Sequence, residues 1–283
     1  MLRVNGATRL YAVIGHPVAH SRSPAMFHAA FAAAGLNAVY VALDVHPDRL
    51  SRALDGLHAA GASGLNVTIP HKEAAARACA ELTPEARRAG GVNTLRWEAE
   101  GWSGHATDGA GFRAWVEERG LPIRGARVLL AGAGGAARAV APEIAGLGAS
   151  ALCVVSRSGG HAQRIVADLR LRGTADIALQ ARPLDEAPSS RGVGPFDLLV
   201  RALGVETVDT GEAAWWSALV PGAPVLDLNY AERARETRAR AGREGRRFED
   251  GLGMLLHQGL LSFEFWTGTP APAEWMRAAL SFE

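Results

Sequence analysis

The chain has 283 residues, of which 48% are hydrophobic and 21% charged, and its net charge at pH 7 is +1. This length predicts about two domains of roughly 150 residues each, and the composition is that of a folded globular protein, which excludes a mainly disordered chain. A near-zero net charge gives no broad positive field, so we expect no nucleic-acid partner.

Apolar runs alternate with helix-like stretches along the chain, which predicts an α/β fold with mostly parallel strands. In the N-terminal third we expect strands at 10–14, 38–43 and 64–68, a strand pair at 93–98 and 102–105, and helices at 24–34, 47–60 and 71–81. A helix from about residue 108 meets a Leu-Pro-Ile-Arg-Gly break at 121–125. Beyond the break we expect strands at 127–131, 151–155, 196–202 and 225–229, and helices at 136–146, 160–171, 231–247 and 252–266.

The segment from Gly132 to Ala137 stands between a predicted strand and a predicted helix and reads Gly-Ala-Gly-Gly-Ala-Ala. In this context the first glycine allows a tight turn, the second lets a pyrophosphate approach the backbone, and the final small residue lets the helix pack on the strand. We therefore predict a dinucleotide site at Gly132, Ala133, Gly134, Gly135 and Ala136. A tight turn without a ligand is the alternative.

The next strand ends in Ser156-Arg157-Ser158, where NAD-binding proteins usually have Asp or Glu. Arg157 can pair with a 2′-phosphate, and the hydroxyls of Ser156 and Ser158 can donate hydrogen bonds to it. We therefore expect NADP as the cofactor. If Arg157 is only a surface residue at a strand end, the choice between NADP and NAD stays open.

Lys72 is the only lysine among 30 basic residues, and the other 29 are Arg. Lysine can lose a proton near neutral pH when its surroundings shift its pKa, whereas arginine cannot. The bias predicts that Lys72 occupies a position that a guanidinium cannot serve, with a solvated helix residue as the alternative. Cys79 and Cys153 have no second Cys or His at zinc spacing, so we expect neither a metal site nor a disulfide framework.

The N-terminal segment has no signal-peptide pattern, and no apolar run reaches the roughly 18 residues of a membrane span. We therefore expect a cytoplasmic protein with no membrane partner. The assembly stays open, with a homodimer as one candidate.

Five polar segments occur at 15–24, 66–73, 91–94, 107–109 and 250–258; they read GHPVAHSRSP, NVTIPHKE, GVNT, TDG and DGLGMLLHQ. In this order, with the glycine turn before the last of them, they resemble the shikimate dehydrogenase family over residues 11–266. The resemblance implies an N-terminal α/β substrate-binding and catalytic domain (1–110), a Rossmann-type NADP-binding domain (111–248) and C-terminal helices that return to the substrate domain (249–283).

The resemblance also implies a role for each polar residue. Lys72 and Asp108 would form a catalytic pair that passes the proton of the reacting hydroxyl, and which of the two carries the proton stays open. The substrate-binding residues would be Ser21 and Ser23 for the carboxylate with Tyr230 near it, and Asn66, Thr68, Asn93 and Gln258 for the hydroxyls. Gly251 would belong to the cofactor site. Each residue has an ordinary alternative as a cap, a turn former or a buried polar group.

The activity that the resemblance implies is the reversible reduction of 3-dehydroshikimate to shikimate with NADPH, a step of chorismate and aromatic amino acid biosynthesis. The chain departs from the family pattern at Ala106 and Arg201, where Asn is usual, at Leu203, where Thr is usual, and at His161, where a basic residue often stands. These departures keep two alternatives open: a quinate or aminoshikimate dehydrogenase paralogue, and a non-catalytic dinucleotide-binding sensor.

Overall fold

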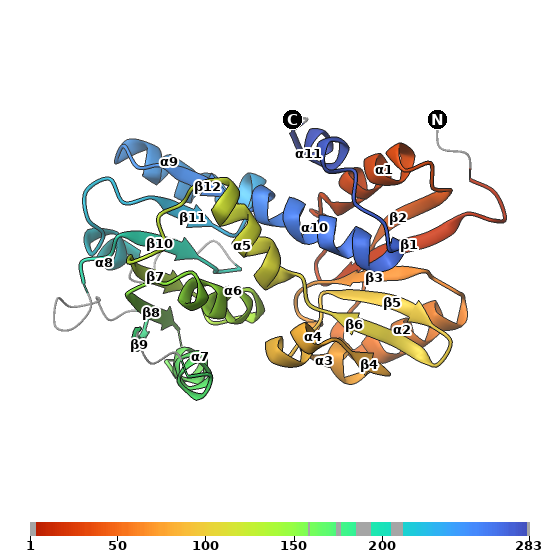
Figure 1. Ribbon diagram of the computed structural model, residues 1–283, viewed down its shortest axis with the longest axis horizontal. Helices are drawn as coiled ribbons and strands as arrows, with labels where there is room; N and C mark the ends of the chain where they lie inside the picture. Colours follow the sequence, from red (N-terminus) through yellow and green to blue (C-terminus); the bar gives the residue numbers. More distant parts are fainter. Residues whose placement is uncertain (1–3, 158, 174–176, 185–193, 205–211, 282–283) are drawn as a thin grey trace. The chain divides into compact units, whose positions relative to one another are not determined.

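The computed structural model describes residues 4–157, 159–173, 177–184, 194–204 and 212–281, so the expected cofactor residue Ser158 lies outside the described residues. The chain forms two compact units, one from Met1–Gly111 with Leu255–Glu283 and one from Phe112–Met254. Each unit contains a six-stranded sheet with helices packed on it, which confirms the predicted α/β class (Figure 1). Within the described ranges, no helix combines the length and the apolar character that a membrane span needs.

The sheet of the first unit has the strand order β2-β1-β3-β5-β6-β4. Its strands are β1 (Arg9–Gly15), β2 (Ala38–Asp44), β3 (Gly64–Val67), β4 (Glu81–Leu82), β5 (Thr94–Glu98) and β6 (Gly101–His105). β1 pairs in parallel with β2 and β3, whereas β5 runs antiparallel to both β3 and β6. The predicted pairing of residues 93–98 with 102–105 is therefore confirmed.

The helices of the first unit follow its strands along the chain and cover its sheet (Figure 1). They are α1 (Ser23–Ala33), the 3-10 turn η1 (Pro47–Arg49), α2 (Leu50–Ala59), α3 (Lys72–Arg77), α4 (Pro84–Ala89) and α11 (Ala273–Ser281); α5 (Asp108–Glu118) begins in this unit and α10 (Leu252–Thr267) ends in it. The helix expected over 71–81 was too long, because the chain turns after Arg77 and Glu81 enters β4, which pairs with β6.

An aromatic cluster joins α10 to the sheet and α1. The ring of Trp266 lies 5.0 Å from that of Tyr11 and 5.1 Å from that of Phe27, and its Nε1 donates to Leu95 O at 2.8 Å. Gly64 on β3 makes this approach possible, since a Cβ there would stand 2.5 Å from Trp266 Nε1. Burial of these rings fixes α10 on the first unit.

The second unit has an all-parallel sheet with the order β12-β11-β10-β7-β8-β9. Its strands are β7 (Arg127–Ala131), β8 (Ala151–Ser156), β9 (Ala178–Pro183), β10 (Leu198–Arg201), β11 (Val225–Asp227) and β12 (Phe248–Asp250). The chain order reverses between β7 and β10, which is the switch point of a doubly wound sheet. This is the Rossmann-type architecture that the sequence predicted.

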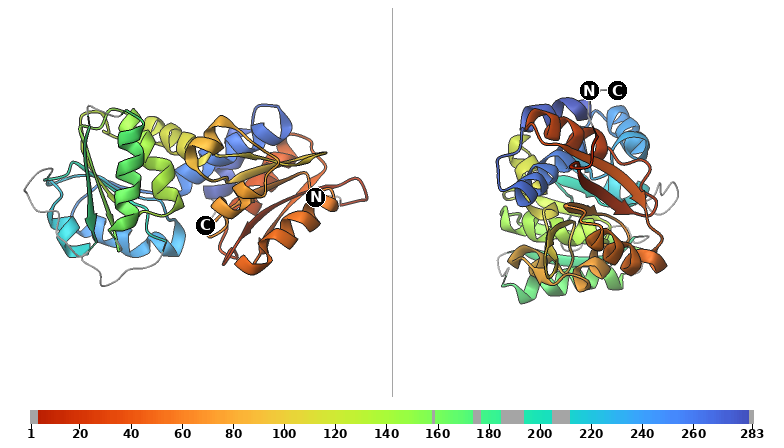
Figure 2. Two further views of the ribbon diagram at one scale, coloured as in Figure 1. Left: turned by 90° about the horizontal axis from the view of Figure 1, so that it is seen from below. Right: turned by 90° about the vertical axis from the view of Figure 1, so that its right-hand side faces the viewer.

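Helices cover both faces of this sheet, as Figure 2 shows. They are α6 (Gly135–Gly146), α7 (Gly160–Leu171), α8 (Glu212–Ser217), the 3-10 turn η2 (Ala231–Ala234) and α9 (Arg235–Arg243). Residues of α5, α6 and α7 share one core with the sheet, and residues of α8 and α9 share a second. The helix expected over 231–247 is divided into η2, α9 and a turn before β12.

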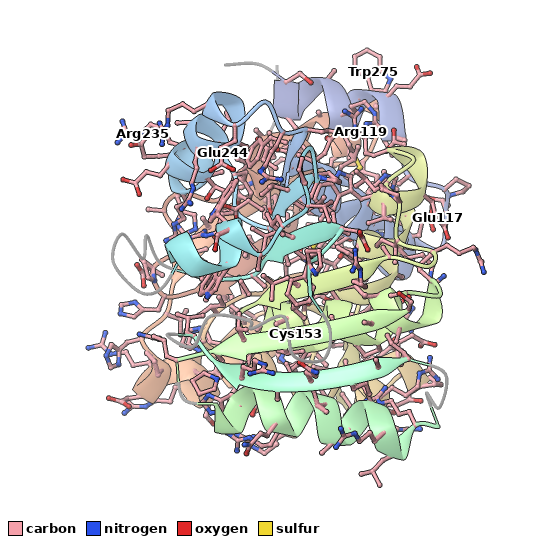
Figure 3. All side chains as sticks on the ribbon, turned by 90° about the vertical axis from the view of Figure 1, so that its left-hand side faces the viewer. Glu117, Arg119, Cys153, Arg235, Glu244 and Trp275 are labelled. Atoms are coloured by element: carbon pink, nitrogen blue, oxygen red, sulfur yellow. The ribbon has the colours of Figure 1, made fainter. Side chains whose placement is uncertain are left out.

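Both cysteines are free thiols. Cys153, labelled in Figure 3, lies in β8 and is fully buried. Burial raises the pKa of Cys79 and of Cys153 to about 11, so both stay protonated at neutral pH. Within the described ranges, His, Cys, Asp and Glu side chains form no group of three that could hold a metal ion.

Candidate active site

The first unit holds an ion pair between Lys72, the first residue of α3, and Asp108, the first residue of α5. Lys72 Nζ donates to Asp108 Oδ2 at 2.7 Å, and the two side chains are 19% and 9% exposed. An ammonium and a carboxylate held together under limited exposure can share and transfer a proton to a third group that reaches them. The two residues that the resemblance pairs are thus in direct contact.

Asn93, immediately before β5, fixes the other oxygen of that carboxylate. Its Nδ2 lies 3.1 Å from Asp108 Oδ1, 2.8 Å from Thr107 Oγ1 and 3.2 Å from Gln258 Oε1, while its Oδ1 accepts from Thr107 N–H at 2.8 Å. Both oxygens of Asp108 therefore accept hydrogen bonds, which fixes the orientation of the carboxylate. Because Gln258 accepts through Oε1, its two amide N–H donors point away from Asn93.

His71, the residue before Lys72, fixes the loop that leads into α3. His71 is buried, its Nε2 lies 2.7 Å from Val45 O, and its backbone N–H donates to Thr68 O at 2.9 Å. Since a carbonyl only accepts, Nε2 carries the proton. His71 thus anchors the start of α3 to the end of β2.

Asn66, on β3, belongs to a second layer of the same network. Its Nδ2 lies 3.0 Å from Asn93 O, 3.2 Å from Thr94 Oγ1 and 3.0 Å from Ser262 Oγ, and its Oδ1 accepts from Tyr40 O–H at 2.7 Å. Ser262 is fully buried on α10 and donates to Gln258 O at 2.9 Å. The amide donors of Asn66 are therefore used within the protein, and its Oδ1 keeps a lone pair for a ligand hydroxyl.

Ser262, Tyr40 and Thr107 were not singled out as site residues by the sequence. Thr107 precedes Asp108 in a quoted motif, which is a local signal. Ser262 and Tyr40 lie among apolar residues of a helix and a strand, and their contact with Asn66 depends on segments 196 and 26 residues away from it. Nothing in the sequence near either residue marks that contact.

Ser21 and Ser23 lie at the start of α1, and Thr68 lies just after β3. Ser21 Oγ accepts from the backbone N–H of Ser23 at 3.3 Å, and Ser23 is buried while Ser21 is half-buried. The loop that leads to these serines is joined to the β3–α3 loop, because His16 N–H donates to Ile69 O at 3.0 Å. A Cβ on Gly15 would stand 2.4 Å from Thr68 Cγ2, so the two loops pack in contact.

The glycine turn of the second unit fits the phosphates of a dinucleotide. Gly132 has φ +120, and a Cβ there would stand 2.5 Å from Ala202 O, so both its conformation and its packing require glycine. Gly134 has φ −80, and no atom lies within 4 Å of where its Cβ would be. Packing does not demand glycine at Gly134. The open space lies at the start of the 12-residue helix α6, where the N–H groups of a helix favour an anion.

Ala133, Gly135 and Ala136 complete this turn, and all three are half-buried, whereas Ala137 is fully buried against the sheet. After β8, the side chain of Arg157 is exposed, while Ser156 is buried and its Oγ accepts from Ala162 N–H at 3.3 Å. The hydroxyl oxygen of Ser156 thus caps the start of α7, and its part in cofactor binding stays a prediction. His161, in the first turn of α7, is exposed.

Tyr230 and Gly251 also belong to the second unit. Tyr230 is half-buried at the start of η2. Gly251 N–H donates to Asn229 O at 2.8 Å, and a Cβ on Gly251 would stand 2.2 Å from Leu228 O. Close packing on the backbone after β11 is thus sufficient reason for glycine at 251, and its assignment to the cofactor site stays a prediction.

Two family models match separate segments of the chain, and known proteins match nearly all of it. The family model described as the shikimate dehydrogenase substrate binding domain matches residues 13–95, and that of the shikimate 5'-dehydrogenase C-terminal domain matches residues 251–280. A shikimate dehydrogenase (NADP(+)) from Geobacter metallireducens is 41% identical over 277 residues, which cover 97% of this chain and 96% of the relative. This chain belongs to the shikimate dehydrogenase family.

Solved structures of the family have the same fold. Shikimate dehydrogenase from Aquifex aeolicus superposes with a TM-score of 0.84 at 28% identity, covering 99% of this chain and 100% of that one. Shikimate 5-dehydrogenase from Thermus thermophilus, solved in complex with NADP(H) and shikimate, gives a TM-score of 0.78 at 31% identity and covers 96% and 98% of the two chains. Of the residues expected to depart from the family pattern, Ala106 is half-buried, Arg201 ends β10 and Leu203 follows two residues later.

Proposed function

We propose that the protein is an NADP-dependent shikimate dehydrogenase that reversibly reduces 3-dehydroshikimate to shikimate. The observation that carries the proposal is the contact between Lys72 Nζ and Asp108 Oδ2 at 2.7 Å in a chain of this family. Reduction of a ring ketone needs a hydride on carbon and a proton on oxygen. NADPH, when bound, supplies the hydride.

The chain's own residues supply the proton and hold the ring. Lys72 Nζ gives a proton to the substrate oxygen, while Asp108 holds the ammonium in place through Oδ2. Asn93 keeps that carboxylate oriented through Oδ1. In the reverse direction the same Nζ receives the hydroxyl proton.

The proposed substrate contacts follow from donor and acceptor types. Asn66 accepts a hydroxyl proton through Oδ1, Gln258 donates through Nε2, and Thr68 offers a hydroxyl on the loop before Lys72. Ser21 and Ser23, at the start of α1, bind the carboxylate, because hydroxyls and helix N–H groups both favour an anion.

NADP is the proposed cofactor, bound by the glycine turn and by Arg157. The open space at Gly134 lies at the N-terminus of α6 and leaves room for a phosphate. Arg157 is exposed at the strand end where NAD-binding proteins usually have a carboxylate, which would repel the 2′-phosphate of NADP. Ser156, Ser158 and Gly251 are further proposed contacts.

The proposed compartment is the cytoplasm, in line with two unpaired thiols. A homodimer is the proposed assembly, to be tested by light scattering.

An absorbance assay at the reduced-nicotinamide band tests the proposal. Purified protein is given shikimate or quinate as substrate and NADP or NAD as acceptor, in all four combinations. We expect fast turnover with shikimate and NADP only. Activity confined to quinate or to NAD would make the protein a paralogue, and cofactor binding without turnover would make it a sensor. Arg201 and His161 are two of the departures from the family pattern that make both alternatives worth testing.

A further inference from the structure

Arg201 and Asp227 form a buried ion pair in the second unit. Arg201 is the last residue of β10 and stands in register with Ala131 on β7 and Asp227 on β11. Arg201 Nη1 lies 3.1 Å from Asp227 Oδ2, and the side chains are 7% and 0% exposed. The charge that Arg201 brings to the end of β10 is thus compensated inside the protein.

Asn229 extends this pair into a closed ring. Asp227 Oδ1 accepts from Asn229 N–H at 3.0 Å and from Asn229 Nδ2 at 2.8 Å, and the same Nδ2 donates to Leu203 O at 2.8 Å. The two hydrogens of the Asn229 amide are thereby divided between Asp227 and Leu203. The ring leads from the side chain of Arg201 through Asp227 and Asn229 back to the backbone two residues after Arg201.

The backbone of Ala202, which lies between Arg201 and Leu203, packs against the glycine turn. Ala202 N–H donates to Ala131 O at 2.7 Å, and Ala202 O would lie 2.5 Å from a Cβ on Gly132. β7 and β10 are the two strands at the switch point, and doubly wound sheets bind dinucleotides beyond the carboxyl ends of the strands there. A shift of residues 201–203 would therefore move the surroundings of the turn that receives the pyrophosphate.

We propose that Arg201, Asp227 and Asn229 form a polar brace that holds residues 201–203 against Gly132 and so positions the NADP site. The inference rests on the proposed function, because it takes the glycine turn as the cofactor site. The three brace residues act through the backbone and are positioning residues. Burial raises the pKa of Asp227, and the guanidinium of Arg201 opposes that rise. Removing either side chain would leave the other as a buried charge without its counter-charge.

The full-length protein provides the test through NADPH binding, measured by titrating the fluorescence of bound reduced nicotinamide. Asn229→Ala removes the link to Leu203 O and leaves the ion pair intact. We expect it to raise the Kd for NADPH by about tenfold, while the KM for shikimate changes by less than about twofold. Asp227→Asn, which leaves the Arg201 charge without its carboxylate, is expected to raise that Kd further and to lower Tm as well.

A second ion pair on the same two strands is the matched control. Arg127, at the start of β7, makes two hydrogen bonds of 2.8 and 2.9 Å to Asp197, immediately before β10. Because this pair lies at the amino ends of the strands, Arg127→Met should lower Tm and leave the Kd for NADPH unchanged. An unchanged Kd in Asn229→Ala and Asp227→Asn, with NADPH bound by the wild type, would overturn the brace alone. A wild type that binds no NADPH would overturn the proposed function with it.

Discussion

Lys72 is a titratable group in a chain whose other basic residues, apart from histidine, are arginines. Lys72→Arg keeps a cation that Asp108 can hold, but a guanidinium does not give up its proton near neutral pH. We expect this variant to lower kcat by about 10²- to 10⁴-fold, with little change in Tm or in the Kd for NADPH. Steady-state kinetics with shikimate, together with the fluorescence titration, measures these changes.

Arg77→Lys is the control for this substitution. Arg77 lies on the same helix, α3, and is exposed, so replacing its arginine side chain by lysine should leave kcat unchanged. A kcat of Lys72→Arg close to that of the wild type would rule out proton transfer by Lys72.

At the residue scale, the sequence identified the groups that carry chemistry because they stand in short motifs. Lys72, Asp108, Asn93 and Gln258 were predicted together from their resemblance, and the structure joins all four by hydrogen bonds. The partners that orient them were not predicted. Ser262 is an example, because nothing in the apolar sequence around this serine indicates that its hydroxyl accepts a hydrogen bond from the distant amide of Asn66.

At the element scale, the packing of α10 on β3 depends on the absence of a side chain at Gly64. A Cβ there would stand 2.5 Å from Trp266 Nε1, and the ring is held by its hydrogen bond to Leu95 O. We therefore expect Gly64→Ala to lower the free energy of unfolding by about 1–3 kcal/mol through overpacking. Urea denaturation followed by circular dichroism measures the change.

Gly56 provides the matched comparison in the same unit. It is exposed in the middle of α2, and no atom lies within 4 Å of where its Cβ would be. Gly56→Ala should stabilise the protein by about 0.5–1 kcal/mol, because alanine loses less conformational freedom in a helix. If Gly64→Ala unfolds at the same urea concentration as the wild type, Trp266 moves freely and the tight packing inferred for α10 is wrong.

Several elements with an apolar pattern of their own could be predicted from the sequence, whereas two very short strands that depend on a neighbouring strand could not. The strands 127–131 and 151–155 and the helix 160–171 were located to within a residue, because each has a continuous apolar pattern of its own. β4 and β12 have two and three residues, and they are strands only because β6 and β11 lie beside them. Such elements follow from tertiary pairing, which local periodicity does not record.

At the scale of the whole molecule, the first unit is built from two separate parts of the chain. Residues from Leu255 onward return to the sheet formed by the first third, and Ser262 and Trp266 make two of the hydrogen bonds that join them. No hydrophobic pattern in the sequence encodes that return, and only the family resemblance implied it. The second unit, in contrast, is one continuous segment whose strand–turn–helix order is legible along the chain.

The two units should therefore respond to different ligands. In hydrogen–deuterium exchange, we expect NADP+ to protect backbone amides around Gly132–Ala137 in the second unit, because those N–H groups would meet the phosphates. Shikimate should protect the loop before Lys72 and the start of α5 in the first unit, where Lys72 and Asp108 are paired. Since each ligand orders the groups it binds, NADP+ protection confined to the first unit would contradict the assignment of the cofactor to the glycine turn, whatever the turnover assay gives.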